Sequence, residues 1–375
     1  MINTDAIKNI CYGCMACLNI CPVSAIDYYN SLKNGNLINI DSATCIKCGK
    51  CEKVCPITND EYYSQDVLQG FWGFSNDDQI RFNSSSGGIF AEIANHVLKK
   101  HGVVFGTIFD NRDKSIHYVS TDEVELKTIM KSKYAESCIG NIYLKIRNNL
   151  EKNRMVLFCG TPCHVNGLLN YLNGKDWANL LTIDFLCHGV PSSKLLYDTL
   201  IEFEEKYGKI SNIDFRPKEF GWSKKTLKIF FEDGRIKVKN SSYLSAFFNN
   251  YSLKNSCYSC KYRNGSAADI TIGDFNGYRD YDSSINDEKG LSLIFTRSIK
   301  GQKWFDLVKN HITYNKLGSK YYEYAFAYDL CSELNKHEYF DRLVDRKGSV
   351  EAIKKIQRRE FINSVNKKIK SYINK

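Results

Sequence analysis

Eight cysteines near the N-terminus follow one spacing pattern twice, and cysteines at this spacing hold iron–sulfur clusters. In each copy, three cysteines are two residues apart and a fourth, three residues further on, precedes a proline: Cys11, Cys14, Cys17 and Cys21, then Cys45, Cys48, Cys51 and Cys55. In two-cluster ferredoxins the fourth cysteine of each copy ligates the other cluster. The pattern therefore predicts two [4Fe–4S] clusters, one on Cys11, Cys14, Cys17 and Cys55, the other on Cys45, Cys48, Cys51 and Cys21. Zinc is the alternative, but its sites usually use paired ligands in separate knuckles.

Four later cysteines could form a second redox centre. Cys163 and Cys187 each follow a predicted strand, and these two strands are expected to be neighbours in one parallel sheet. Both thiols should then lie at the carboxyl edge of the sheet, where ligands of open α/β sheets bind. Cys257 and Cys260 add a CxxC pair, so the four thiols together could hold a third [4Fe–4S] cluster. A zinc-ribbon fragment and buried free thiols are alternatives that spacing alone leaves open.

The remaining cysteines are expected to pack in the core, although Cys159 lies close enough to Cys163 to compete as a ligand. They are Cys138, Cys159 and Cys331.

Two glycine-rich turns, Ser84–Gly88 and Gly160–Pro162, each open a predicted helix. The free amides and positive dipole end of a helix N-terminus suit the pyrophosphate of a flavin. Ordinary helix capping is the alternative, and neither a GxGxxG nor a Walker pattern is present. His164 and His188 stand beside candidate ligands and could relay protons, but a hydrogen-bonded structural role is expected for each.

Strands and helices alternate around these residues, which predicts a parallel βαβ unit. The helix after Gly88 has apolar residues on one face, and Thr161 should cap the helix that begins at Pro162. Asp233-Gly234 predicts a hairpin. The expected elements are strands at 103–109, 155–159 and 180–187, a helix at 193–207, and hairpin strands at 225–231 and 235–239.

Composition narrows the class of protein. The chain has 375 residues, enough for two or three domains, and its 15 cysteines fit cluster ligation better than a disulfide framework. The N-terminus lacks the apolar core of a signal peptide, and no apolar run reaches the roughly 20 residues of a membrane span, so a cytoplasmic protein without a transmembrane segment is expected.

The charge is concentrated at the C-terminus. The net charge is +10, and residues 351–375 contain eight Lys/Arg against two Glu. No nucleic-acid reader motif accompanies these charges, so nucleic acid is not an expected partner. Isoleucines and a valine recur at helical spacing in the same segment, with a basic opposite face. We expect a helix that docks on the body, with peripheral contact with anionic lipid as a weaker alternative.

As a set, these motifs resemble the coenzyme F420 hydrogenase/dehydrogenase beta-subunit family, in the form with an N-terminal two-cluster ferredoxin. The resemblance extends from Cys11 to about Gly301. The motifs that carry it are Ser84–Gly88, Ser132-Lys133-Tyr134, Gly160–Cys163, Cys187–Pro191, Cys257-x2-Cys260 and Asp269–Asp274. It implies an FAD and a [4Fe–4S] cluster in the body of the protein.

Carried over by position, the resemblance makes Cys163, Cys187, Cys257 and Cys260 the ligands of the body cluster. The flavin contacts that it implies are Ser86, Gly87, Gly88, Lys133, Gly160 and Thr161. His164, where relatives commonly have Gln, and Asn276, where an aromatic residue often stands, depart from the pattern and could alter the substrate pocket.

The predicted fold is an α+β ferredoxin-like two-cluster module followed by an α/β flavin and iron–sulfur domain with a basic C-terminal helix. The expected boundaries are a ferredoxin domain at 1–60, the N-terminal and C-terminal regions of the beta-subunit domain at 67–150 and 151–310, and a helical segment at 311–375.

The expected function is a flavin-dependent iron–sulfur oxidoreductase that passes electrons between a hydride-exchanging small molecule (F420-like or other), FAD and the clusters. A redox partner protein or carrier is expected. Two alternatives are an electron-transfer subunit without its own substrate site and a cluster-bearing scaffold in polysaccharide biosynthesis. No catalytic acid or base is predicted.

Overall fold

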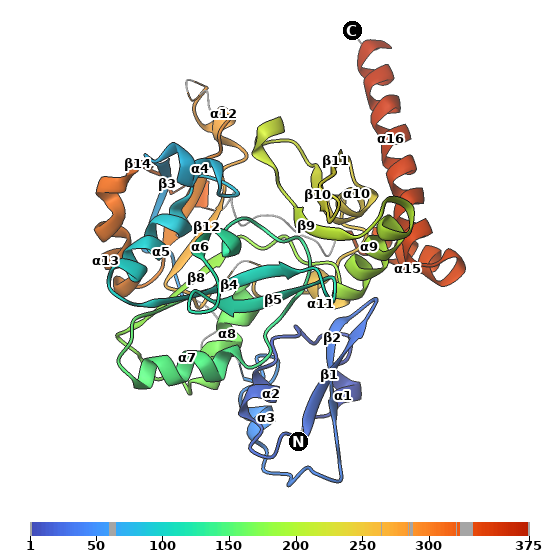
Figure 1. The fold of residues 1–375 in the computed structure, drawn as a ribbon. Helices are drawn as coiled ribbons and strands as arrows, with labels where there is room; N and C mark the ends of the chain where they lie inside the picture. The colour runs from blue at the N-terminus through green and yellow to red at the C-terminus, as the bar shows by residue number, and fades with distance from the viewer. Residues whose placement is uncertain are drawn as a thin grey trace.

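The computed structural model describes residues 2–59, 65–263, 265–283, 285, 288–319, 321–322 and 333–373, so Cys331 lies outside the described residues. An N-terminal module lies at one end of the molecule, beside a body built on one large sheet (Figure 1). A smaller lobe with its own sheet carries the C-terminal helices.

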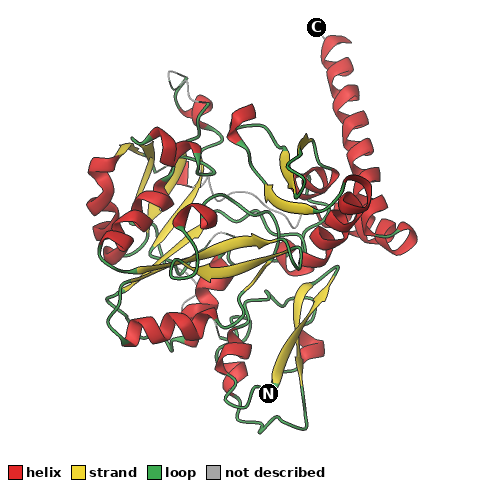
Figure 2. Ribbon diagram, viewed as in Figure 1, coloured by secondary structure: helices red, strands yellow, loops and turns green. Residues whose placement is uncertain are grey.

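The N-terminal module is a hairpin with short helices around it. Strands β1 (Ile26–Ser31) and β2 (Gly35–Ile40) pair antiparallel, and Figure 2 shows them apart from the central sheet. The helices are α1 (Thr4–Ile7), α2 (Ala16–Ile20) and α3 (Lys50–Lys53). Each of the last two begins beside a cysteine of the repeat, so the helices and the cysteine motifs are positioned together.

The body is a nine-stranded sheet with the order β14-β3-β13-β12-β8-β7-β4-β5-β6. Strands β4, β7, β8 and β12 are mutually parallel neighbours, as the βαβ pattern predicts, while β13, β3 and β14 extend the sheet antiparallel. The strand bounds are β3 (Gln69–Ser75), β4 (Val103–Asp110), β5 (Ser115–Ser120), β6 (Ser137–Cys138), β7 (Val156–Cys159), β8 (Leu180–Phe185), β12 (Ile270–Asp274), β13 (Ser292–Thr296) and β14 (Ile312–Lys316).

Alternating side chains cover the two faces of this sheet. Val104 and Leu157 pack in the core under α5 (Ile89–Lys99) and α13 (Ile299–Val308). Their neighbours Val103 and Phe158 point into the opposite core, which contains α7 (Ile142–Glu151) and α8 (Pro162–Tyr171). The second core also contains Met15 and Ala16 of the N-terminal module, so the module packs on the body through α8 and α7.

The lobe contains the predicted hairpin. Strands β9 (Ile210–Asp214), β10 (Leu227–Phe231) and β11 (Ile236–Lys239) form an antiparallel sheet, with β10 at its centre. The helices of the lobe are α9 (Ser193–Tyr207), α10 (Ser242–Phe248), α15 (Leu334–Lys347) and α16 (Ser349–Ile373). The remaining short helices are α4 (Asp78–Phe82), α6 (Leu126–Ile129), α11 (Asn255–Tyr258) and α12 (Tyr278–Tyr281), with 3₁₀ turns at Lys218–Phe220 and Lys309–His311.

Helix α16 docks on the lobe by its first half. Ala352, Ile353 and Ile356 are fully buried there, whereas Phe361 and Ile362 are exposed and the helix extends away from the body (Figure 1). Val365 and Ile369 are exposed as well. Among the described residues, no helix is both long and apolar enough to cross a membrane.

The region predicted as a helical segment at 311–375 is not helical throughout. It begins with β14, which pairs with β3 at the edge of the sheet. Ile312 faces the core while its neighbour Thr313 is exposed, an alternation typical of a strand. Because β3 pairs with β13 as well, the regions 67–150 and 151–310 share one sheet.

Candidate iron–sulfur centres

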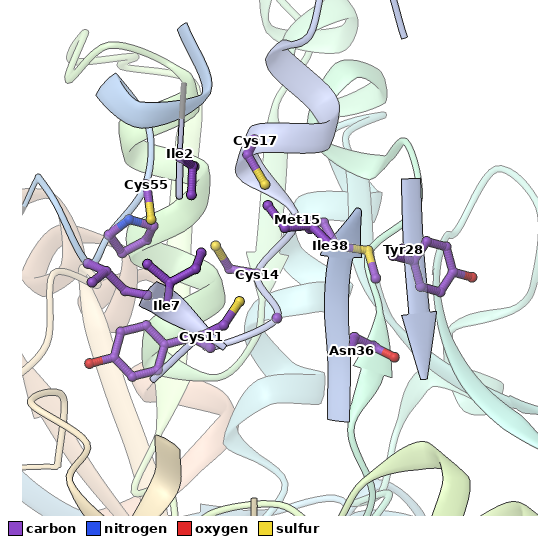
Figure 3. Close-up of a pocket in the computed structure, with 14 residues that line it drawn as sticks. Ile2, Ile7, Cys11, Cys14, Met15, Cys17, Tyr28, Asn36, Ile38 and Cys55 are labelled. Atoms are coloured by element: carbon purple, nitrogen blue, oxygen red, sulfur yellow. The ribbon is translucent and has the colours of Figure 1, made fainter. Parts of the chain in front are cut away.

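Cys11, Cys14, Cys17 and Cys55 surround one cavity in the N-terminal module. Its lining includes these four cysteines and the side chains of apolar residues (Figure 3). Cys14, Cys17 and Cys55 are buried. Burial raises the pKa of Cys14 and Cys17, and neighbouring thiols of the set raise it further. The set is the one that the crossed pattern of the repeat predicts.

Cys21, Cys45, Cys48 and Cys51 line the second cavity. Here too, three ligands come from one copy of the repeat and the fourth from the other. This cavity is more accessible to solvent than the first, because Cys48 and Ile46 are exposed. The second site therefore lies at the surface of the module, while the first faces the body.

Both sites have the ligand number of a [4Fe–4S] cluster, because four cysteines line each cavity. Among the described residues, no three Cys, His, Asp or Glu side chains form a site for a single metal ion. Backbone amides already point at two sulfurs: Ala25 N donates to Cys21 Sγ at 3.3 Å and Lys47 N to Cys45 Sγ at 3.4 Å. Such bonds stabilise thiolate sulfur and tune the potential of a cluster.

The structure also gathers the four body cysteines. Cys163 lies in the first turn of α8, Cys187 follows β8, and Cys257 lies in α11. Burial raises the pKa of Cys163 to about 11 and that of Cys187 to about 12, and Cys257 adds to both shifts. Burial also raises the pKa of Cys260, and the other three thiols raise it further. Four half-buried thiols within electrostatic reach of one another suit a shared metal cluster that would take them as thiolates.

Cys159 is not part of this group. Burial raises its pKa to about 12, with the carboxylate of Asp184 next in effect and Lys133 opposing both. Cys138 contacts the N-terminal module, with its Sγ 3.3 Å from Tyr28 Oη and 4.0 Å from Met15 Sδ.

Thr161 precedes α8 as predicted, but its hydroxyl does not cap the helix. Its Oγ1 lies 3.2 Å from Cys163 Sγ and lowers the pKa of that thiol. The residue therefore contacts a candidate ligand directly.

His164 and His188 are both held among neighbouring side chains of the body. His164 is buried with its Nδ1 3.0 Å from Tyr118 Oη, and burial lowers its pKa to about 3, with Lys254 adding to the shift. Burial and then Arg263 lower the pKa of His188 to about 4. Burial therefore favours the neutral form of both imidazoles.

Several polar groups in the predicted flavin-binding turn at 84–88 are engaged within the chain. Ser86 Oγ donates to the carbonyl of Leu291 at 2.5 Å, and Gly87 N donates to Ser292 Oγ at 2.9 Å. Ser85 Oγ accepts from Ser132 N at 2.5 Å, which brings the 84–88 turn beside the segment with Lys133.

Sequence reasoning missed a group of buried cations beside this turn. Lys218 Nζ donates to the carbonyls of Arg81 and Ser86, at 2.5 Å each. Arg216 bonds to Tyr134 Oη and forms an ion pair with Asp274. Burial, together with the charges of Arg81 and Arg216, lowers the pKa of Lys218 to about 7. The guanidinium groups of Arg81 and Arg216 remain charged at this edge, and such positive charge suits a phosphate group.

Comparison with known protein families gives two matches, one in the N-terminal module and one in the body. Residues 10–59 match the model of the 4Fe–4S dicluster domain, and residues 153–319 match the model of the C terminus of the coenzyme F420 hydrogenase/dehydrogenase beta subunit. The match to the beta-subunit model therefore follows the match to the dicluster model along the chain. The family resemblance is confirmed, and the beta-subunit match spans Cys163, Cys187, Cys257 and Cys260.

Among solved structures, a chain of the F420-reducing [NiFe] hydrogenase complex from Methanosarcina barkeri is similar at 17% identity. The match covers 77% of this chain and 94% of that chain, with a TM-score of 0.47. No curated protein matches the chain. The dicluster domain and the beta-subunit domain together make the protein an iron–sulfur protein of the oxidoreductase type, related to the F420 hydrogenase beta subunit.

Proposed function

We propose that this protein is a flavin-dependent iron–sulfur oxidoreductase that holds three [4Fe–4S] clusters and one FAD. It would exchange electrons between a hydride-donating or hydride-accepting small molecule, F420-like or other, and a separate redox carrier. The observation that carries the proposal is the gathering of twelve cysteines into three sets of four, two around cavities and one at the edge of the sheet. When bound, the clusters would supply one-electron transfer, and the flavin would exchange both single electrons and hydrides.

Helix α8 would hold the body site close to the first cavity of the module. Cys163 and Gly167 are four residues apart on this helix, so they lie one turn from each other on the same face. A Cβ placed at Gly167 would be 3.0 Å from both Cβ and Sγ of Cys14. A ligand of the body site and a ligand of the first cavity are thus separated by a single helical turn.

The aromatic residues Tyr12 and Tyr262 complete this junction. Their rings meet edge to face with centroids 5.2 Å apart. Tyr12 lines the first cavity, and Tyr262 follows Cys260 by two residues. Packed side chains at this junction would exclude water between the two sites, while exposed Cys48 would leave the outer site open to a carrier protein.

The flavin and its substrate would bind at the carboxyl edge of the sheet. Burial lowers the pKa of both Lys133 and Lys218 to about 7, and a bound phosphate would favour their protonated forms beside the guanidinium group of Arg216. Lys133 Nζ donates to the carbonyls of Met130, at 2.7 Å, and of two further residues, which fixes the ammonium group in place.

The composition of the purified protein tests this proposal. Iron, acid-labile sulfide and flavin would be measured per chain on protein purified without oxygen. About twelve irons and one FAD are expected, since each cubane contains four irons. About eight irons and no flavin would contradict the proposal and favour an electron-transfer subunit or a cluster-bearing scaffold.

A further inference from the structure

A buried ion pair of the body reaches into the N-terminal module. The side chains of Lys254 and Glu136 are 2% and 1% exposed and form a salt bridge with each other. Lys254 Nζ also donates to the carbonyl of Tyr12 at 3.0 Å, and Glu136 Oε2 accepts from Asn36 N at 2.7 Å. Tyr12 and Asn36 both line the first cavity, so the pair bonds directly to the wall of that site.

The module is shaped to receive this pair by two glycines. A Cβ on Gly13 would lie 2.6 Å from Glu136 Oε1, and a Cβ on Gly35 would lie 2.2 Å from Glu136 Oε2 and 2.4 Å from Lys254 Cδ. Both glycines have a positive φ, of +69° and +70°, that other residues rarely adopt. Any larger residue at either position would displace the pair from the module.

The two charges act on both ligand sets. On the side of the first cavity, Lys254 Nζ bonds to the carbonyl of Tyr12, the residue that follows Cys11. On the side of the body set, the backbone N–H of Cys257 donates to the carbonyl of Lys254 at 2.9 Å. The pair therefore lies between two candidate cluster sites, with a cation and an anion in electrostatic reach of each.

Stability alone does not account for such a pair. Desolvation of two charges commonly offsets their attraction, and apolar replacements of buried ion pairs are often neutral or stabilising. A cluster, by contrast, gains a negative charge each time it is reduced, so a nearby fixed charge changes its potential directly.

We propose that Lys254 and Glu136 are positioning residues that set the reduction potentials of the two clusters on either side of them. The inference rests on the proposed function, because it requires clusters in both sites. The cation favours the reduced state of each cluster and the anion opposes it. The pair thereby holds the potentials of the two neighbouring sites within a range that permits transfer between them.

EPR-monitored redox titration of the cluster-loaded full chain tests this role. In Glu136→Gln the amide keeps the shape and an acceptor for Lys254 but removes the negative charge. We expect the potentials of both flanking clusters to rise by at least about 59 mV, the equivalent of a tenfold change in a one-electron equilibrium constant. The cluster on Cys21, Cys45, Cys48 and Cys51 should shift less. The double variant Lys254→Gln/Glu136→Gln should bring both potentials back towards those of the wild type.

Glu204→Gln is the matched control, since Glu204 forms a buried ion pair with Lys114 at 3.1 Å in the lobe. Potentials in Glu136→Gln that move no more than in this control would overturn the inference. So would a double variant that moves further from the wild type, because a purely structural role predicts additive damage. Fewer than three clusters in the wild-type protein would instead overturn the proposed function.

Discussion

Gly167 of α8 lies directly against Cys14 of the N-terminal module, where an added Cβ would meet both Cβ and Sγ of the cysteine at 3.0 Å. The hydroxyl of Tyr143 closes the same space from the body side, at 3.1 Å. Because Cys163 stands one turn earlier on α8, this contact fixes the spacing between two candidate cluster sites. The junction depends on the absence of a side chain at residue 167.

Gly167→Ala should loosen the cluster in the first cavity. Alanine favours the helix by about 1 kcal/mol, but overpacking typically costs about 1–3 kcal/mol and here acts on a ligand. We expect iron to be lost to a chelator several times faster from this variant, and only from about four of its irons. Gly318→Ala is the control, because a Cβ there has only ordinary contact with Tyr321, at 3.8 Å. Equal rates in the two variants would contradict the tight junction.

The crossed ligand sets predict which cysteine substitutions combine. Cys21→Ser and Cys48→Ser affect the same cavity, so the double variant should lose about four irons, no more than either single variant. Cys21→Ser combined with Cys14→Ser should lose about eight, since Cys14 lines the other cavity. Cys138→Ser serves as the matched control and should keep its full iron content. Additive loss in Cys21→Ser/Cys48→Ser would refute the crossed assignment.

Lys218 should make stability depend on pH. Burial holds its pKa at about 7 in the folded protein, well below the value of about 10.4 for a free lysine, so the unfolded chain binds more protons between these values. The cost of burying the charge is therefore fully present below pH 7 and relieved as the pH rises. Lys218→Met should be more stable than the wild type at pH 7 by roughly 2–4 kcal/mol, and this difference should shrink towards pH 10.

This comparison is made by thermal unfolding of flavin-free protein, with exposed Lys303→Met as the control. Added FAD should reduce the pH dependence if its phosphates bind beside Lys218. A stability difference that stays constant from pH 7 to pH 10 would show that the ammonium group is already compensated.

The two halves of α16 should contribute differently to stability, and two truncations can show this. Removal of residues 361–375 deletes exposed Phe361 and Ile362 and should leave the unfolding temperature nearly unchanged. Removal of residues 349–375 also deletes Ile353 and Ile356, and the loss of each buried isoleucine costs about 2–5 kcal/mol. Removal of residues 361–375 also tests the alternative of lipid contact. This alternative requires that the full chain sediments with anionic vesicles and that the chain without residues 361–375 does not. Identical sedimentation of the two proteins would exclude this contact.

The sequence predicts the parts of the protein that are determined by residues close together in the chain. The x2-x2-x3 spacing of cysteines before proline fixes both sets around the cavities, because neighbouring residues determine the loop around each cluster. The alternation of strand and helix likewise predicts β7, α8, β8 and α9, the last with its observed bounds. These elements are determined by periodicity and by caps such as Ser192, which accepts from Leu195 N at 3.2 Å.

The parts that were missed depend on contacts between distant segments. Lys254 and Glu136 are 118 residues apart, and nothing in the sequence around either one indicates that the two side chains meet. Lys218 reaches Ser86 across a similar separation. β14 escaped prediction because it is short and lies at the edge of the sheet, where only pairing with β3 distinguishes a strand from a loop.

The position of β3 imposes an order on folding during synthesis. This strand is the first of the central sheet to leave the ribosome, yet both of its partners, β13 and β14, lie more than 200 residues further along the chain. At roughly 5–20 residues per second, β3 would wait on the order of 10–40 seconds for them. The N-terminal module needs only its own residues to pair β1 with β2 and to close its two cavities. Cluster insertion can therefore precede the assembly of the body, and α8 would then dock onto a module that already holds its iron.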